Sequence, residues 1–176
     1  MKRRTADDAR TGEEPSLTRT ATPAVSGSIV MIDLDDFSEI VDERGWSRYK
    51  PNPATGLLSS LIEDFARKWQ AVIVYGLDWD RGTEEAVLEL PGVEAGELAG
   101  DLARIEAELC SAARVSATIV AVTVPGLTGL ATSERRPAYT GYRRRVKRIL
   151  ESLKRRGGGV VYVDGEVIFT SPCRRI

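Results

Sequence analysis

The sequence predicts one α+β domain in which helices cover a mostly antiparallel β-sheet. Short apolar runs rich in β-branched residues alternate with longer segments whose apolar residues repeat at helical spacing. The pair Asp164-Gly165 stands between two such runs near the C-terminus and is typical of a two-residue β-hairpin turn. A chain of 176 residues has room for one domain with a sizeable core.

Six segments have the composition of β-strands, and four have the apolar spacing of amphipathic helices. The predicted strands are residues 28–33, 71–75, 86–90, 115–124, 160–163 and 167–169. The predicted helices are residues 36–45, 57–69, 95–109 and 142–153. Residues 46–53 and 126–137 are predicted loops, and 76–85 is the acidic tip of a hairpin.

The resulting order, β-α-α-β-β-α-β-α-β-β, contains the split βαβ pattern of ferredoxin-like folds, with a C-terminal β-hairpin added. We expect two helices to cover one face of the sheet. Residues 1–27 show no apolar periodicity and are predicted to form a flexible N-terminal arm. Residues 28–176 are predicted to form the single domain.

The chain contains no histidine, which excludes Ser-His-Asp and Cys-His catalysis and histidine-ligated zinc. Cys110 and Cys173 are too few for a disulfide framework, and Cys110 is expected to be a small buried apolar residue. The remaining chemistry belongs to carboxylates, Lys, Arg, hydroxyls and oxygen-ligated metals. Mg²⁺ fits that set of ligands best.

The lack of a long apolar segment and of a signal region predicts a cytoplasmic protein that does not enter a membrane. No apolar run approaches the roughly 18 residues that a span needs, and no apolar signal region follows the basic residues 2–4. The formal net charge is −1. Asn52 and Gln70 are the only side-chain amides, a depletion typical of thermophiles.

Carboxylates gather where the first predicted strand meets the first predicted helix. Because side chains alternate along a strand, Asp33 and Asp35 should point the same way. The helix N-terminus that follows favours anionic groups, so this junction could seat Mg²⁺ and a triphosphate. The alternative is that Asp35 or Asp36 only caps the helix and the other carboxylates are solvated.

The hairpin tip carries a second set of acidic side chains. If the first and second strands are neighbours, these side chains approach Asp33 and complete an oxygen-rich site for one or two metal ions. They are Asp78, Asp80, Glu84 and Glu85. The alternative is a solvated acidic turn.

Two segments of the chain resemble GGDEF diguanylate cyclases. Residues 31–45, M-I-D-L-D-D-F-S-E-I-V-D-E-R-G, resemble that family's opening D-[LI]-D-x-F-K-x-[IV]-N-D-x-x-G. Residues 142–157, Y-R-R-R-V-K-R-I-L-E-S-L-K-R-R-G, resemble its last helix, A-L-Y-x-A-K-x-x-G, so the resemblance covers about residues 28–163. Where the family has its G-G-D-E-F turn, residues 76–85 read G-L-D-W-D-R-G-T-E-E and lack the glycine pair, so ordinary cyclase activity is not expected.

Divergent palms related to that family include archaeal GTP cyclohydrolase III and the minimal palms related to CRISPR polymerases. The segment Pro51-Asn52-Pro53 is similar to a Pro-Asn-Pro stretch before the second helix of the cyclohydrolase. An aspartate follows the strand ending Val74-Tyr75, as one does in the cyclohydrolase hairpin. The resemblance therefore favours GTP hydrolysis of the cyclohydrolase type over nucleotidyl transfer.

The resemblance implies a role for particular residues. Metal would be held by Asp33, by the Leu34 carbonyl and by Asp78 or Asp80, and these aspartates would be the catalytic residues. The nucleotide would contact Asp35, Asp36, Phe37, Asn52, Lys147 and Lys154. The implied ligands are a purine nucleoside triphosphate, GTP above all, and one or two Mg²⁺ ions. A non-catalytic nucleotide sensor on the same palm is the alternative.

Residues 135–156 carry a concentration of positive charge. Its ten members are Arg135, Arg136, Arg143, Arg144, Arg145, Lys147, Arg148, Lys154, Arg155 and Arg156. Such a segment could bind nucleic acid through phosphates, which would make the protein a nucleic-acid-binding accessory. The favoured interpretation is a solvated helix face balanced by the acidic helix at residues 94–108. We also expect the chain to form a homo-oligomer.

Overall fold

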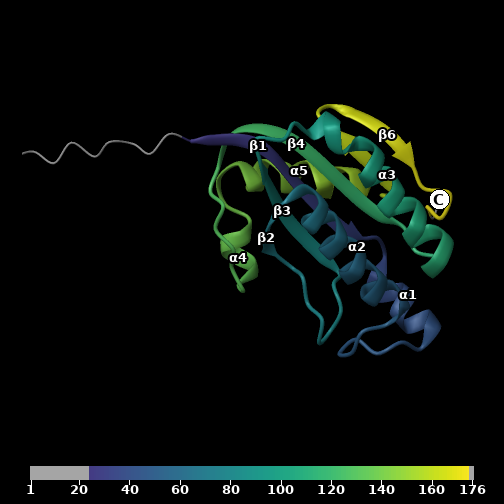
Figure 1. Ribbon diagram of the computed structural model, residues 1–176. Coiled ribbons are helices and arrows are strands. Elements are labelled where there is room, and N and C mark those ends of the chain that lie inside the picture. The colour runs from purple at the N-terminus through teal and green to yellow at the C-terminus, as the bar shows by residue number, and fades with distance from the viewer. Residues whose placement is uncertain (1–23, 175–176) are drawn as a thin grey trace, which may run out of the picture.

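The computed structural model describes residues 24–174, which form one six-stranded sheet with helices on both faces (Figure 1). The strands lie in the order β2-β3-β1-β4-β5-β6. Only β4 and β5 run parallel, and the other neighbouring pairs are antiparallel. The strands are β1 (Val25–Leu34), β2 (Val72–Tyr75), β3 (Glu85–Pro91), β4 (Ala117–Leu127), β5 (Val160–Val163) and β6 (Glu166–Thr170). The prediction of an α+β protein with a mostly antiparallel sheet is confirmed.

Two details of the sheet differ from the prediction. The first strand begins at Val25, so residues 25–27 extend β1, and the rest of the predicted arm lies outside the described residues apart from Ala24. The strand beside β1 is β3 and not β2. The acidic hairpin therefore reaches β1 through its second strand, because β3 pairs with β1 over seven residues.

The four predicted helices are present, and a fifth lies at the end of a predicted loop. The helices are α1 (Phe37–Arg44), α2 (Pro53–Trp69), α3 (Ala99–Glu108), α4 (Arg135–Ala138) and α5 (Gly141–Arg155). A 3-10 turn, η1 (Ala95–Leu98), precedes α3, and a π-helical turn, η2 (Leu109–Ala113), follows it. The second helix starts earlier than predicted because Asn52 caps it, accepting hydrogen bonds from the N–H groups of Ala54 and Thr55 at 3.0 Å each.

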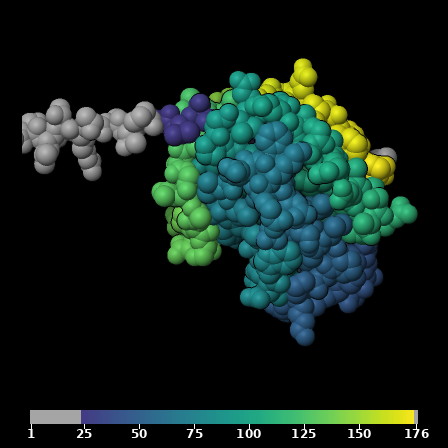
Figure 2. Space-filling model, viewed as in Figure 1, coloured from purple at the N-terminus to yellow at the C-terminus, as the bar shows by residue number. Residues whose placement is uncertain are grey.

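Helices cover both faces of the sheet, where the sequence predicted one face. A first core packs α1, α2 and α3 on one side, and a second packs α4 and α5 on the other. Figure 2 shows the face that α2 and α3 cover. The second layer follows from the parallel pair β4–β5, since a parallel neighbour needs a crossover connection and α5 supplies it.

The central strand β1 contributes to both cores. Val30 and Ile32 point toward α2 and α3, whereas Ile29 and Met31 point toward α5. This explains why the strand reads as a continuous apolar run rather than an alternating one. Its polar end at Asp33 is half-buried.

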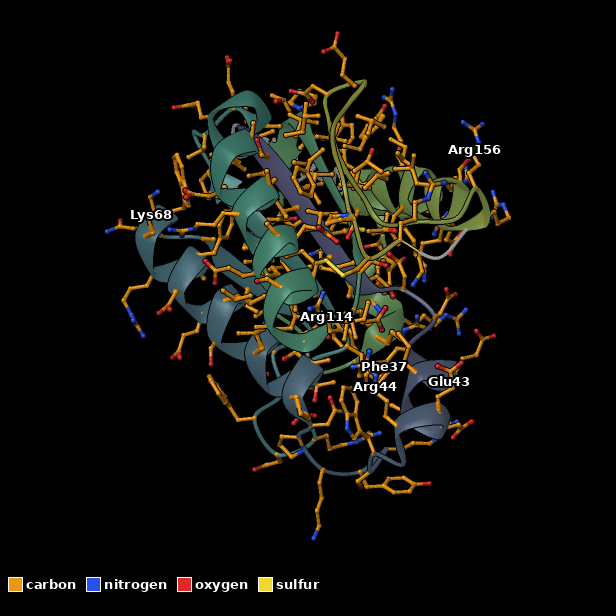
Figure 3. The ribbon with its side chains drawn as sticks, turned by 90° about the vertical axis from the view of Figure 1, so that its right-hand side faces the viewer. Phe37, Glu43, Arg44, Lys68, Arg114 and Arg156 are labelled. Atoms are coloured by element: carbon orange, nitrogen blue, oxygen red, sulfur yellow. A yellow bond between two sulfur atoms is a disulfide. The ribbon has the colours of Figure 1, made fainter. Side chains whose placement is uncertain are left out.

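The short helix α1 is tied to the far end of the α3 segment. Arg44, its last residue, donates hydrogen bonds to the carbonyl oxygens of Ala113 at 2.6 Å and Arg114 at 2.7 Å. Figure 3 shows Phe37, Arg44 and Arg114 in one neighbourhood. Across residues 24–174, no helix combines the length and apolar character that crossing a bilayer requires.

The two cysteines form a disulfide, which the sequence analysis did not predict, and Cys110 is buried, as expected. Cys110 lies in η2, and Cys173 follows β6. The two cysteines are 63 residues apart in the sequence, so nothing local predicts that they touch. They meet because β6 pairs antiparallel with β5 and brings the C-terminal segment back. The cytoplasmic location stays a prediction, and the disulfide argues against it, since such bonds persist mainly in oxidising compartments.

Replacing both cysteines by serine should lower the free energy of unfolding. The disulfide closes a loop of 63 residues, and the chain-entropy relation gives about 4 kcal/mol for a loop of that length. Urea unfolding of the wild type with and without reductant, and of the double serine variant, measures the difference. Equal midpoints for the oxidised and reduced wild type would contradict the expectation.

Candidate functional site

A charged cavity lies at the end of β1, between the β2–β3 hairpin and the start of α1. Its volume is about 460 Å³. Carboxylates and cations share its lining with the first turn of α1. The lining residues are Asp33, Leu34, Asp36, Phe37, Ser38, Tyr75, Gly76, Asp78, Arg81, Gly82, Glu84, Glu85, Arg135 and Lys154. Charges of both signs therefore meet in one hollow.

The hairpin tip is held in place by the second helix. The hydroxyls of Ser59 and Thr83 lie 2.8 Å apart, and the Thr83 N–H donates to the Thr55 carbonyl at 3.3 Å. Gly82 fits against Thr55 only because it has no side chain: an added Cβ would lie 2.1 Å from the Thr55 hydroxyl oxygen. Its φ of +88° also favours glycine. The polar contacts with α2 thus fix where the acidic residues of the hairpin lie.

Asp33 and Leu34 present oxygen atoms to a single cation. The Lys154 ammonium donates to the Asp33 carboxylate and, at 2.9 Å, to the Leu34 carbonyl oxygen. It also lies 3.9 Å from the Asp35 carboxylate. Burial raises the pKa of Asp33, and the neighbouring ammonium opposes that shift. Two hard oxygen ligands from adjacent residues thus face one positive charge.

Asp35 faces the protein interior and does not line the cavity. Its carboxylate accepts hydrogen bonds from the hydroxyls of Thr118 at 2.7 Å and Ser116 at 3.1 Å, and from the Gly159 N–H at 2.7 Å. Burial raises the pKa of Asp35, and these hydrogen bonds oppose the shift. The expected contact between Asp35 and a nucleotide is corrected, because the carboxylate already binds β4 and the glycine turn after α5.

Glu85 lies directly across from Asp33 in the β1–β3 register, which brings the two side chains to the same face of the sheet. Its carboxylate binds the Arg135 guanidinium and accepts a hydrogen bond from the Tyr139 hydroxyl at 2.8 Å. Burial favours a raised pKa for Glu85, but the hydrogen bonds from Arg135 and Tyr139 outweigh it and hold the pKa below its usual value. The ionised carboxylate is therefore the stable form.

The acidic hairpin residues divide into two groups. Asp78 and Glu84 line the cavity with Glu85, whereas Asp80 does not. One carboxylate oxygen of Asp78 accepts from the N–H groups of Asp80 at 2.9 Å and Arg81 at 2.8 Å, which shapes the turn. Burial raises the pKa of Glu84. The metal role of Asp80 stays a prediction, but its side chain lies on the exposed tip, outside the cavity lining.

The remaining predicted nucleotide contacts also divide. Asp36 and Phe37 line the cavity, and Lys154 reaches it from α5. Asn52 does not line it, because its side chain caps α2. Lys147 lies 3.8 Å from the centre of the Tyr139 ring and lines a second hollow on the α5 side.

That second hollow adjoins the first and has a volume of about 260 Å³. The two hollows share Asp33, Glu85, Arg135 and Lys154. Sequence reasoning did not assign Arg81, Arg135 or Tyr139 to the site. Arg135 and Glu85 are 50 residues apart, and no motif links them.

Within residues 24–174, no three acidic or cysteine side chains converge closely enough to form a metal-binding group. The carboxylates of the cavity instead share its lining with three cationic side chains, Arg81, Arg135 and Lys154. The oxygens of Asp33 and Leu34 nevertheless share one cation, and such hard oxygen donors are the ligands that Mg²⁺ prefers. A divalent ion bound to these two oxygens would have to displace the ammonium of Lys154.

The fold and this cavity define an α+β protein with a polar cleft of mixed charge at the end of its central strand. No protein-family model matches the chain, and no curated protein matches it either. Function is therefore argued from the cavity and its residues.

Replacing Asp35 by Ala should destabilise the fold. The change leaves the Gly159 N–H and two hydroxyls without their buried acceptor, and the expected loss is about 2–3 kcal/mol. Urea unfolding measures it, with Asp80→Ala as the control, since an exposed substitution of this kind changes stability by less than about 0.5 kcal/mol. Equal stability of the two variants would contradict a structural role for Asp35.

Replacing Arg135 by Gln should raise the pKa of Glu85, because the guanidinium that lowers this pKa is lost while the burial that raises it remains. In the wild type the depressed pKa gives a stabilising contribution that is present above the ordinary value of 4.5 and lost as the pH falls through the folded-state pKa. The variant should lose this contribution. A ¹³C NMR titration of the Glu85 carboxyl measures the shift, and an unchanged or lower pKa would contradict it.

Proposed function

We propose that this protein binds a purine nucleoside triphosphate together with Mg²⁺, on a palm domain of the nucleotidyl-cyclase/GGDEF type. The observation that carries the proposal is the convergence of the Asp33 carboxylate and the Leu34 carbonyl on one cation at the edge of the cavity. That pair is part of the ligand set implied by the resemblance to the GGDEF family, whose third member would be Asp78 or Asp80.

The topology supports a palm. The first four strands lie in the order β2-β3-β1-β4, with β3 antiparallel to both β1 and β2. Helices α1 and α2 connect β1 to β2, and α3 connects β3 to β4. This arrangement agrees with a split βαβ unit of the ferredoxin-like kind. The motif aspartate Asp33 then lies at the end of the central strand.

The residues around the cation fit a divalent metal. Asp33 and the Leu34 carbonyl would hold it, with Glu85 in place of the predicted Asp78 or Asp80. Magnesium usually binds through one or two carboxylates and keeps its other positions for water and phosphate oxygens. When bound, it would polarise the phosphates and neutralise their charge.

The rest of the cavity suits a triphosphate. Arg81, Arg135 and Lys154 supply positive charge, and the first N–H groups of α1 lack intrahelical partners. Phe37 and Tyr75 offer aromatic surface for a base. The volume of about 460 Å³ lies in the range of small-molecule sites, roughly 300–1,000 Å³.

The reaction that we propose is hydrolysis of the bound GTP, of the kind that archaeal GTP cyclohydrolase III performs. Burial raises the pKa of Glu84, which suits its carboxylate to take a proton from an attacking water. Lys154 and Arg135 would stabilise negative charge on the phosphates. Glu84 is exposed and lines the cavity, so water can reach its carboxylate.

The second candidate is a nucleotide sensor without turnover. It is favoured by the ion pairs of the cavity, since Lys154 binds Asp33 and Arg135 binds Glu85. Both carboxylates that would hold metal are thus already neutralised within the chain. A site of this kind can bind a charged ligand without positioning it for attack.

Replacing Asp33 by Asn should weaken Mg²⁺-dependent GTP binding by about 100-fold, since loss of a metal ligand is at least as severe as loss of the groups that orient ligands. Isothermal titration calorimetry with GTP, in Mg²⁺ and in EDTA, measures the effect. Asp80→Asn is the matched control, because it removes an equal charge outside the cavity and should bind GTP as the wild type does.

The proposal fails if the wild type binds no triphosphate, or if both variants bind it equally well. Turnover separates the two candidates. Phosphate, pyrophosphate or an opened purine ring detected by NMR supports the hydrolase, whereas tight Mg²⁺-dependent binding with unchanged GTP supports the sensor.

A further inference from the structure

The outer face of α4 and α5 carries arginines that bind no carboxylate. Seven of the 15 residues of α5 are basic, and one is acidic. Six exposed arginines have no acidic side chain within 4 Å in the described part of the chain: Arg136, Arg144, Arg145, Arg148, Arg155 and Arg156. We call these six the basic face. Arg143 is not among them, because it is buried 3.5 Å from Glu89.

The acidic helix does not balance this charge, which corrects the favoured interpretation of the sequence. The α3 helix packs on one side of the sheet and α5 on the other (Figure 1). Asp101 of α3 binds Lys68 and Arg104 on its own side. Figure 3 shows Lys68 and Arg156 projecting from opposite sides of the protein. The positive charge is therefore segregated.

Two shallow hollows border α5 along this face. One, of about 540 Å³, has Arg136, Arg144 and Arg148 in its lining together with the acidic Glu151. The other, of about 350 Å³, has Arg145, Arg148 and Arg156 in its lining together with the apolar surface of Ile149, Leu153 and Tyr162. Arg148 belongs to both, so the helix forms a ridge between two tracks of guanidinium groups. Arginine forks bind phosphate through two hydrogen bonds.

We propose that the basic face binds the phosphate backbone of duplex DNA. Arg144 and Arg155 are 11 residues apart on α5, about 16 Å along the axis, which matches about five nucleotides of one strand. A B-form major groove admits an α-helix, and its two bordering strands offer phosphates to both tracks. The contacts carry no base preference, because the face presents charges and few groups that read base edges.

A membrane surface fits this face less well. An interfacial helix inserts its apolar side into the lipid, but the apolar side of α5 is occupied: Val146 and Leu150 are buried against the sheet. Arg144 and Arg148 therefore present charge alone. Duplex DNA provides a denser and more regular array of phosphates for such a surface than lipid headgroups do.

The test is fluorescence anisotropy with a labelled 20-base-pair duplex of arbitrary sequence, titrated between 50 and 200 mM salt. The wild type should bind with affinity that falls steeply as salt rises. Arg144→Glu combined with Arg148→Glu should weaken binding at least tenfold at low salt. It should also lower the slope of log affinity against log salt by about 2, at roughly 0.9 per phosphate contact.

The matched control is Arg67→Glu combined with Arg104→Glu. These side chains are 69% and 64% exposed on α2 and α3, so the net charge changes equally on the other side of the sheet. The control should bind DNA within about twofold of the wild type, allowing for long-range electrostatics. Asp33→Asn should bind DNA normally, so failure of the nucleotide proposal is distinguishable from failure of this one.

Three results would overturn the inference. They are an absence of salt-dependent duplex binding, equal losses in the α5 and control variants, and binding to anionic vesicles without binding to the duplex. Circular dichroism and retained GTP affinity of the Arg144→Glu/Arg148→Glu variant exclude a folding defect as the cause of lost DNA binding.

Discussion

The candidate site depends on the buried carboxylate of Asp35, whose hydrogen bonds connect three segments of the chain. Asp35 follows β1 directly and accepts hydrogen bonds from Ser116 and Thr118, at the start of β4, and from Gly159 after α5. Gly158 must lack a side chain there, since an added Cβ would lie 2.4 Å from an Asp35 oxygen. The C-terminal end of α5 is thereby held against β1, and Lys154 reaches Asp33.

Lys154 neutralises the charge of Asp33 when no ligand is bound, and this sets a condition on metal binding. Its ammonium occupies the oxygens of Asp33 and Leu34 that a metal would need. Two charges of +1 and +2 held 4 Å apart would repel by about 8 kcal/mol at an effective dielectric constant near 20. Metal and ammonium therefore cannot share these oxygens. If the metal ion bound together with a triphosphate, the displaced Lys154 ammonium would form an ion pair with a phosphate instead of repelling the metal.

The sequence predicted those parts of the site that are local in the chain. Asp33 at the end of an apolar run and Phe37 in the following helix are read from neighbouring residues, and both line the cavity. Glu85 was one of four acidic residues expected to approach Asp33, but such reasoning could not single it out. Glu85 and not Asp80 faces Asp33 because β3 rather than β2 pairs with β1, and strand order depends on packing across the whole sheet.

The larger corrections have the same origin. The disulfide joins residues that are 63 positions apart in the sequence. The six arginines of the basic face lie far from the acidic helix α3, because the parallel connection from β4 to β5 places α5 on the other face of the sheet. Strand propensity and helical spacing contain no signal for either event. Positive and negative residues nearly cancel when they are counted along the chain. In the fold, the sheet separates the acidic helix α3 from the basic helix α5.

The cavity and the basic face are connected through Arg135. This residue lines the cavity, the second hollow and the larger hollow beside α5. Its guanidinium binds Glu85, so a phosphate that captured Arg135 would leave the Glu85 carboxylate unpaired. An unpaired carboxylate across from Asp33 attracts a cation more strongly. The same capture would also remove the positive charge of Arg135 from the phosphates of a nucleotide in the cavity. By linkage, whatever effect a ligand at one surface has on binding at the other is reciprocal.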